Sequence, residues 1–207
     1  MRTASDPERR SRRTQQERRE ATRAEIHEGA MRCLKRSGYS GATMVRIAKE
    51  AGVTTGALQH HFEDRRDLMW SVVREGYQRL VSDVGSRLPN GGTLKERVDR
   101  AIDAMIEGYG SAPAMAAYEV VLALRDDEAF VREHLTMTAR YSAELDQQWD
   151  ALFHDVASSD ASKRTARRVA RSCILGLLSS ASTGLASVDE DTVAGLKESV
   201  VHLLSPL

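Results

Sequence analysis

Residues 43–68 read TMVRIAKEAGVTTGALQHHFEDRRDL, and this stretch decides the fold. Thr43 is a typical N-cap residue, and the helix that it starts is expected to end near Glu50. Gly52 then allows a tight turn, because glycine adopts positive φ without steric cost. A second, shorter helix is expected over residues 54–60. A helix, a three-residue turn containing glycine and a second short helix make up a helix-turn-helix.

The two helices of this stretch have an apolar side and a polar side. The apolar positions that lock the helices together are Ile47, Ala48, Ala51, Val53, Leu58 and Phe62. The other face of the short helix carries Thr54, Thr55, Gly56, Gln59, His60 and His61. Its small residues permit close approach, and its hydrogen-bonding groups can reach bases or phosphates. The face therefore favours DNA recognition, although a polar helix face can also simply be solvated.

Residues 43–68 also resemble the signature of the tetracycline-repressor (TetR) family, T-x-x-x-I-A-x-x-A-G-V-S-x-G-x-L-Y-x-H-F-x-x-K-x-x-L. The matching positions are Thr43, Ile47, Ala48, Ala51, Gly52, Val53, Gly56, Leu58, His61, Phe62 and Leu68. Thr54 replaces the usual Ser, and Arg65 replaces the usual Lys. Gln59 stands where the family mostly has a Tyr that contacts a phosphate. Glutamine can donate a hydrogen bond too but reaches less far, so the role of this position stays open.

The resemblance implies an N-terminal three-helix DNA-binding domain whose short helix enters the major groove. The predicted DNA-binding residues are Thr43, Arg46, Thr54, Thr55, Gly56, Gln59, His60, His61 and Arg65. The resemblance implies that Thr43 and Arg46 contact the DNA backbone or a groove edge. It implies base contacts from Thr55, Gly56 and His60, and phosphate contacts from Gln59, His61 and Arg65.

The rest of the chain has a helical pattern as well. Proline occurs four times, aromatic residues make up 5%, and no stretch alternates with period two. We predict an all-α fold with a helix-turn-helix domain followed by a helical ligand-binding and dimerisation domain. The expected divisions are a disordered basic arm at 1–16, the DNA-binding domain at 17–66 and the effector-binding and dimerisation domain at 67–207. Whether the Arg-rich segment 9–23 is an inert tail or contacts DNA stays open.

Further helices are expected at about 17–37, 65–87, 93–109, 113–125, 127–155, 163–185 and 189–204. The helix at 65–87 has two apolar stripes, one of which contains Leu68 and the other Trp70. A helix with two buried sides usually lies between two bodies of protein. We therefore expect it to connect the two domains and to transmit changes between them.

Charge and cysteine content limit the possible partners and the compartment. The chain has no net charge, but residues 1–66 hold 15 basic and 9 acidic side chains, whereas residues 67–207 hold 15 and 21. This asymmetry favours an anionic partner at the N-terminal end alone. Two cysteines fit a reducing compartment. The longest apolar run, residues 173–178, is far too short to span a membrane, and the Arg-rich start does not resemble a secretory signal. We expect a cytoplasmic protein without a membrane partner.

The sequence offers no catalytic or metal-binding pattern. It contains no G-x-S-x-G, no H-E-x-x-H and no glycine-rich phosphate loop. His60 and His61 are adjacent, so on a helix they point about 100° apart, and no second ligand pair lies at i+4. We expect neither enzymatic activity nor a cofactor nor a metal site.

The middle helices carry adaptable and amphipathic side chains that suit a pocket for a small, mostly apolar molecule. The candidate ligand-binding residues are Met105, Tyr109, Tyr118, Leu122, Met137, Tyr141 and Trp149. Each of them could instead be an ordinary core residue. Glu119, Arg125 and Arg140 are either polar anchors of that pocket or members of surface ion pairs.

A dimer is expected because one helix-turn-helix contacts few bases, whereas a two-fold dimer places two recognition helices one turn of duplex apart. The candidate interface lies on the last two helices and comprises Gly176, Ser180, Gly184, Val193, Leu196 and Val200. The small residues would permit close helix approach, and the family builds its dimer contact in this region. The alternative is that both helices pack only into their own subunit.

The sequence therefore predicts a homodimeric transcriptional regulator that binds a palindromic double-stranded operator, most simply a repressor released by a small ligand. A ligand- or partner-binding module that has lost DNA binding is the alternative from another class, and Gln59 favours it. An activator, or a regulator that responds to a protein, is also compatible with the sequence.

Overall fold

The computed structural model describes residues 7–88 and 91–205, with side chains from Thr14 onward. This part of the chain contains nine helices and no strand, which confirms the all-α prediction. The helices are α1 (Pro7–Gly41), α2 (Met44–Ala51), α3 (Thr55–His61), α4 (Arg65–Arg87), α5 (Leu94–Gly110), α6 (Ala112–Ala123), α7 (Glu128–Leu152), α8 (Asp160–Ser182) and α9 (Glu190–Leu204). No helix in these ranges is both long and apolar enough to cross a membrane.

The first helix begins earlier than the sequence suggested. Helix α1 starts at Pro7, so residues 7–16, which we expected to be disordered or frayed, are helical, while residues 1–6 lie outside the described ranges. Arg, Gln and Glu are good helix formers, and the Gln16 side-chain amide donates to the Glu20 carboxylate one turn later at 2.9 Å. The predicted stop is confirmed, because Gly38 has non-helical angles (φ 63°, ψ −178°).

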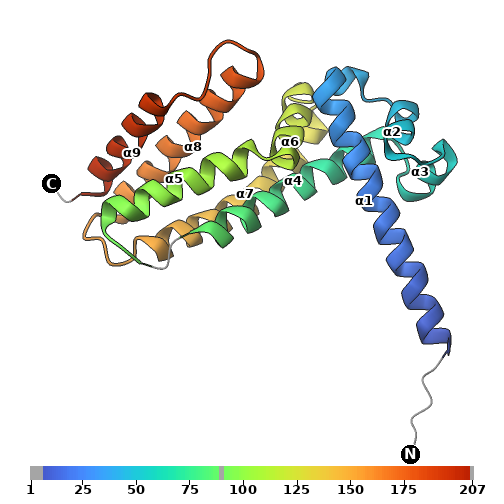
Figure 1. Ribbon diagram of the computed structural model, residues 1–207, viewed down its shortest axis with the longest axis horizontal. Coiled ribbons are helices and arrows are strands. Elements are labelled where there is room, and N and C mark those ends of the chain that lie inside the picture. The colour runs from blue at the N-terminus through green and yellow to red at the C-terminus, as the bar shows by residue number, and fades with distance from the viewer. Residues whose placement is uncertain (1–6, 89–90, 206–207) are drawn as a thin grey trace, which may run out of the picture.

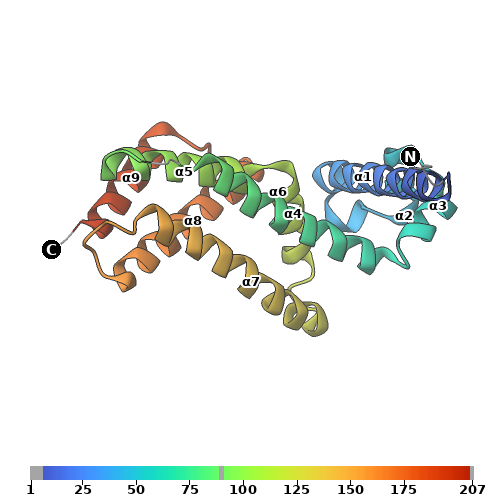
Figure 2. The same ribbon diagram turned by 90° about the horizontal axis from the view of Figure 1, so that it is seen from below.

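The helices of the helix-turn-helix and the helix after it begin at capping side chains, as predicted for Thr43. Thr43, Thr54 and Asp64 cap α2, α3 and α4, each accepting a hydrogen bond from the backbone N–H three residues later. Gly52 adopts the left-handed conformation at φ 70°. Figures 1 and 2 show α1, α2 and α3 grouped at one end of the molecule, with helix α4 running from them into the other helices.

Two apolar cores lie along the molecule, and α4 contributes to both. The first joins α1–α3 to the start of α4, to α6 and to Phe130. The second joins the end of α4 to α5, α7, α8 and α9. Tyr77 and Met137 pack against both cores. The two predicted stripes of α4 are therefore not divided between the two bodies: Leu68 and Trp70 both enter the first core, and the division runs along the helix instead.

A buried histidine joins α1 to α4 inside the first core. His27 is 7% exposed, and its Nε2 lies 2.8 Å from Oγ of Ser71. Ser71 donates its own hydroxyl hydrogen to the Leu68 carbonyl at 2.7 Å, so Nε2 of His27 must be the donor to Ser71. Burial lowers the pKa of His27, with the positive charges of Arg23, Arg79 and Arg74 as smaller causes in the same direction and Glu75 opposing them.

This pKa shift gives stability a pH dependence. Because the folded state binds the His27 proton more weakly than the unfolded chain, the stabilisation is complete above the ordinary histidine pKa of about 6.5 and is lost as the pH falls below it. We expect the melting temperature to fall between pH 7.5 and pH 5.5, and to fall less in His27→Gln. Differential scanning calorimetry of both proteins checks this, and equal pH slopes would refute the assignment to His27.

Candidate nucleic-acid interface and ligand cavity

Helix α3 is held by its apolar side and presents its polar side outward. Leu58 is fully buried and Phe62 is 1% exposed, which anchors the helix on α1 and α2. Among the predicted DNA-binding residues, Thr54, Gly56, Gln59 and His60 are exposed, and Thr55 and His61 are half-buried. A Cβ atom added at Gly56 would meet no atom closer than 4.0 Å, so the surface there is open. The structure thus brings these six positions together on one outward-facing helix.

Three of the predicted contacts also have local structural roles. Oγ1 of Thr54 accepts from the N–H of Ala57 at 3.0 Å and so caps α3. Oγ1 of Thr43 accepts from the N–H of Arg46 at 3.3 Å, and Nη1 of Arg46 donates to the Gly41 carbonyl at 3.3 Å. Thr43 and Arg46 remain exposed at the start of α2. Each of these threonine hydroxyls still has a hydrogen that can be donated to a phosphate.

Arg65 has a different environment from the one that the sequence suggested. Its Nε donates to the Ala42 carbonyl at 3.0 Å, and its Nη2 donates to the Tyr39 carbonyl. The guanidinium group also lies over the Tyr39 ring, 4.0 Å from the centroid. The side chain predicted to bind a phosphate therefore joins the start of α4 to the end of α1 and to Ala42 just after it. These partners of Arg65 could not be predicted from residue types, because both acceptors are backbone carbonyls, which every residue has.

We expect Arg65→Ala to lower the free energy of unfolding by about 1–3 kcal/mol, because it removes two hydrogen bonds from a charged donor and a cation–π contact. Arg66→Ala is the matched control, since its ion pair with Asp127 is largely exposed and should contribute about 0–1 kcal/mol. Urea unfolding of both variants measures the difference. If Arg65→Ala leaves stability unchanged and weakens only DNA binding, the phosphate contact is the correct assignment.

Basic side chains of α1 lie beside the end of α3. Burial lowers the pKa of His61, and the positive charges of Arg19, His60 and Arg23 lower it further. Arg23 also stacks over the Phe62 ring at 4.8 Å. Helix α1 continues past α3 toward the N-terminus (Figure 1). Part of the Arg-rich segment 9–23 therefore borders the polar face of α3, where it could contact the same DNA.

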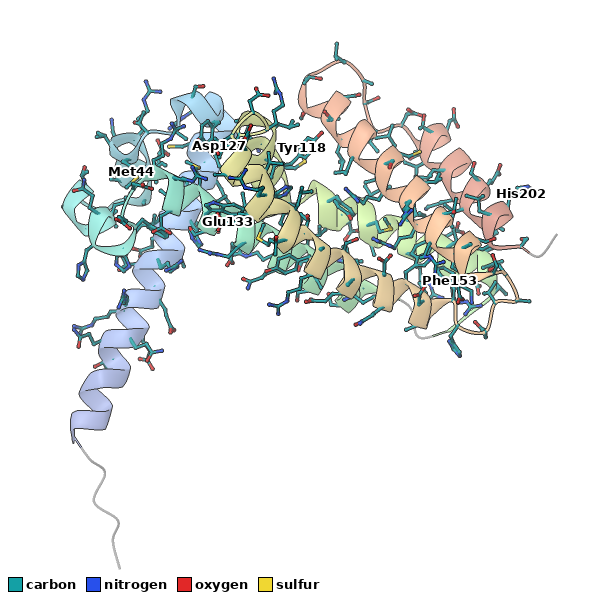
Figure 3. All side chains as sticks on the ribbon, turned by 180° about the vertical axis from the view of Figure 1, so that it is seen from behind. Met44, Tyr118, Asp127, Glu133, Phe153 and His202 are labelled. Carbon is teal, nitrogen blue, oxygen red and sulfur yellow. The ribbon has the colours of Figure 1, made fainter. Side chains whose placement is uncertain are left out.

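A cavity of about 190 Å³ lies between α4, α6, α7 and α8. Of the predicted ligand-binding residues, Tyr109, Tyr118 and Tyr141 line it. Met105 and Trp149 line a neighbouring cavity of only about 20 Å³, which Tyr109 also borders. Figure 3 shows Tyr118 near the helix-turn-helix end, with Phe153 at the opposite end of the helical body.

Two predicted pocket residues lie elsewhere. Leu122 is 40% exposed, and Met137 packs against both apolar cores without lining the cavity. None of the three candidate polar anchors lines it either. Arg125 and Arg140 lie near Asp126 and Glu144 in exposed ion pairs, and Glu119 accepts from the N–H of Tyr39 at 3.1 Å.

Sequence analysis missed the polar lining of the cavity. Tyr77, His134, Arg167 and Arg171 all line it, and Tyr77 donates to or accepts from Nε2 of His134 at 3.1 Å. Met and aromatic residues are the sequence signal for an apolar pocket, whereas an arginine on α8 carries no signal that it faces a cavity. Within the described residues, no cluster of three or more His, Cys, Asp or Glu side chains could hold a metal ion.

The predicted dimer residues divide into two groups. Leu196 is 7% exposed and Val200 is fully buried, and both belong to the second core of their own chain. The apolar stripe on α9 packs on the helices of its own chain, so we no longer include Leu196 and Val200 in the candidate dimer interface. Gly176 and Gly184 are exposed with open space at their Cα atoms, and Ser180 and Val193 are half-buried.

The model of the bacterial regulatory proteins, tetR family, matches residues 26–72. This segment is a DNA-binding domain of the TetR family. The matched segment runs from α1 through α3 into α4, so it includes the whole helix-turn-helix. The HTH-type transcriptional repressor AcnR of Corynebacterium diphtheriae is 42% identical over 62 residues, which are 30% of this chain and 33% of that protein. The chain thus matches about one third of the length of this relative.

Similarity beyond the TetR-family domain is weaker. An uncharacterized HTH-type transcriptional regulator of Mycobacterium bovis is 28% identical over 133 residues, covering 64% of this chain and 68% of that protein. The crystal structure of a TetR-family regulator from Mesorhizobium loti superposes with a TM-score of 0.68 and 14% identity, covering 90% of this chain and 95% of that one. At that identity the structural likeness shows the fold alone, so the cavity must be interpreted from its own residues.

Proposed function

We propose that the protein is a homodimeric, cytoplasmic DNA-binding regulator of transcription, a repressor that a small ligand releases from a palindromic operator. The observation that supports this most strongly is helix α3, whose Leu58 is fully buried while Gln59 and His60 are exposed. Polar side chains held outward on a short, anchored helix are suited to base edges in the major groove. The family model over the same residues and the relatives named as transcriptional repressors support the same function.

Two helices connect the cavity to the DNA-binding domain. Helix α4 lines the cavity with Tyr77 and begins at Arg65, and α6 lines it with Tyr118 and carries Glu119. Arg65 binds the Tyr39 carbonyl, and Glu119 accepts from the Tyr39 N–H. Both helices thus hold the same residue at the end of α1. A ligand that prefers one arrangement of α4 and α6 would thereby shift the orientation of the recognition helix.

The outer side of α8 and the loop after it supply the proposed dimer surface. Gly176 is exposed with nothing within 4 Å of an added Cβ, which leaves room for a partner helix. Leu185 is 83% exposed and Val188 is 36% exposed in the following loop. Apolar exposure of this kind next to small residues favours burial against a second copy. Ser180, Gly184 and Val193 complete the surface.

A ligand- or partner-binding module without DNA binding is the second candidate. Gln59 replaces the tyrosine typical of the family, and Arg65 donates to backbone carbonyls. Both observations reduce the number of phosphate contacts expected from the signature positions.

Selection from a random duplex library with the purified full-length chain tests the proposal. We expect enrichment of an inverted repeat, because a two-fold dimer reads two half-sites. Lack of enrichment over the starting library at low salt, where backbone attraction is strongest, would favour the second candidate.

A further inference from the structure

The cavity between α4, α6, α7 and α8 has positive but no negative side chains in its lining. Its ionisable groups besides tyrosines are His134, Arg167 and Arg171, and no Asp or Glu with a described side chain lines it. Burial lowers the pKa of His134, so its imidazole is mostly neutral at pH 7. The permanent positive charge of the lining therefore comes from the two arginines on α8.

The two arginines differ in their partners. Arg167 is 5% exposed, and it forms an ion pair with Asp146 and donates to Oγ of Ser142 at 3.1 Å. Arg171 follows one turn later on α8 and reaches the solvent, and its guanidinium group has no hydrogen bond or ion pair with any residue in 14–88 or 91–205. The charge of Arg167 is thus compensated by Asp146, whereas the charge of Arg171 is not compensated.

Arg171 lies close enough to the buried phenols to affect them. Its charge favours a lower pKa for Tyr77 and Tyr109, but burial is the larger cause and raises the pKa of Tyr77 to about 12. The phenols stay neutral at physiological pH and do not neutralise Arg171. The hydroxyl groups of Tyr109 and Tyr141 have no hydrogen-bond partner among the described residues, so they can donate to an acceptor in the cavity.

Most of the remaining lining is apolar, with Thr138 and Ser142 as its further polar side chains. The rings of Tyr77 and Tyr141 stack with centroids 5.6 Å apart and an angle of 11° between their planes. Leu80, Val121 and Leu145 are among the aliphatic side chains that extend this surface. The volume of about 190 Å³ corresponds to a small molecule, since one water takes about 30 Å³ of liquid.

We propose that this cavity takes a small amphipathic monoanion, whose apolar body lies against the tyrosine rings and whose carboxylate is bound by Arg171. A carboxylate accepts two parallel hydrogen bonds from a guanidinium group, which a neutral isostere cannot match. The inference rests on the proposed function, because it names the chemical class of the ligand that acts on the regulator. It replaces the mostly apolar ligand expected from the sequence.

Isothermal titration calorimetry without DNA tests this inference on the full chain with three matched pairs of probes. These are 4-phenylbutyrate and its primary amide, 2-naphthoate and its amide, and decanoate and its amide. We expect at least one acid to bind about tenfold or more tightly than its amide, because a charge-assisted bond is lost in the amide. Arg171→Gln should remove that advantage, and Arg171→Lys should keep part of it.

Arg168→Gln is the matched control, because Arg168 is an exposed arginine of the same helix that does not line the cavity. It should keep the preference for the acid. Equal binding of acid and amide, no binding of any acid, or an equal loss in Arg168→Gln and Arg171→Gln would overturn the proposal. Release of DNA by the same probes is measured separately, so an acid that binds through Arg171 without releasing DNA would refute ligand control while leaving the binding site in place.

Discussion

Alanine at both Thr55 and His60 is expected to abolish the preference of the protein for its selected DNA site. Both side chains lie on the outward face of α3, and neither contributes to the apolar core. Loss of a base contact costs about 1–3 kcal/mol, so two losses amount to roughly one to four orders of magnitude in affinity. Fluorescence anisotropy with the selected duplex and with a scrambled duplex at fixed salt measures this preference.

The control for this prediction is alanine at Thr136 and His154, a threonine and a histidine that are exposed in the C-terminal half. That variant should bind both duplexes as the unmodified protein does. The prediction concerns selectivity, because binding to the scrambled duplex depends on phosphate contacts that Thr55→Ala and His60→Ala do not remove. An equal loss on both duplexes would show that these residues contact the backbone and do not read bases.

Glu119→Ala is expected to separate ligand binding from DNA release. The Glu119 carboxylate on α6 accepts from the Tyr39 N–H, so its removal breaks the hydrogen bond between α6 and Tyr39, while the bond from Arg65 on α4 remains. Coupling between two sites in regulators of this kind is typically about 1–3 kcal/mol, or about 5- to 150-fold in affinity. We expect the ratio of DNA affinities with and without ligand to fall toward one, while ligand affinity changes little. Anisotropy titrations at saturating ligand measure the ratio.

Glu119→Gln is the matched control, because its side chain keeps an oxygen that can accept from Tyr39. It should retain most of the response. A full ligand response in Glu119→Ala would contradict the role of α6 and leave α4 as the connection between the two domains. A loss in both variants would point to the negative charge, and not to the hydrogen bond, as the feature that matters.

The DNA-binding domain could be predicted from the sequence because its signals are local. Thr43, Gly52 and Asp64 determine helix ends within three or four residues of themselves, and the structure has these ends. The burial of Leu58 and Phe62 follows from the same short pattern. Periodicity alone favoured a helix-turn-helix, and the eleven positions that match the TetR signature indicated the family.

The cavity could be predicted only in part, because its lining comes from helices far apart in the sequence. Tyr118 and Tyr141 were found since tyrosine is typical of pockets, whereas Arg171 was missed. Whether an arginine on a helix faces solvent or a cavity depends on how that helix packs, which a lone sequence does not define. Arg65 shows the same limit, since its partners are backbone carbonyls 23 and 26 residues away.

The stripe on α9 illustrates why a pattern can support two structures. Leu196 and Val200 have the spacing of a helix interface, and that interface turns out to be with their own chain. An i, i+4 repeat predicts that a helix face is buried but not which helix covers it. The exposed Gly176 and Leu185 can be proposed for a dimer surface only once the chain's own packing is known.

Hydroxyl-radical footprinting of the full-length protein on its selected duplex tests the central claim most directly, namely that two copies of α3 enter one face of DNA together. We expect two protected segments related by two-fold symmetry, with centres separated by about 10 base pairs or a multiple of that turn. A single unsymmetrical segment, or two segments on opposite faces of the duplex, would contradict it.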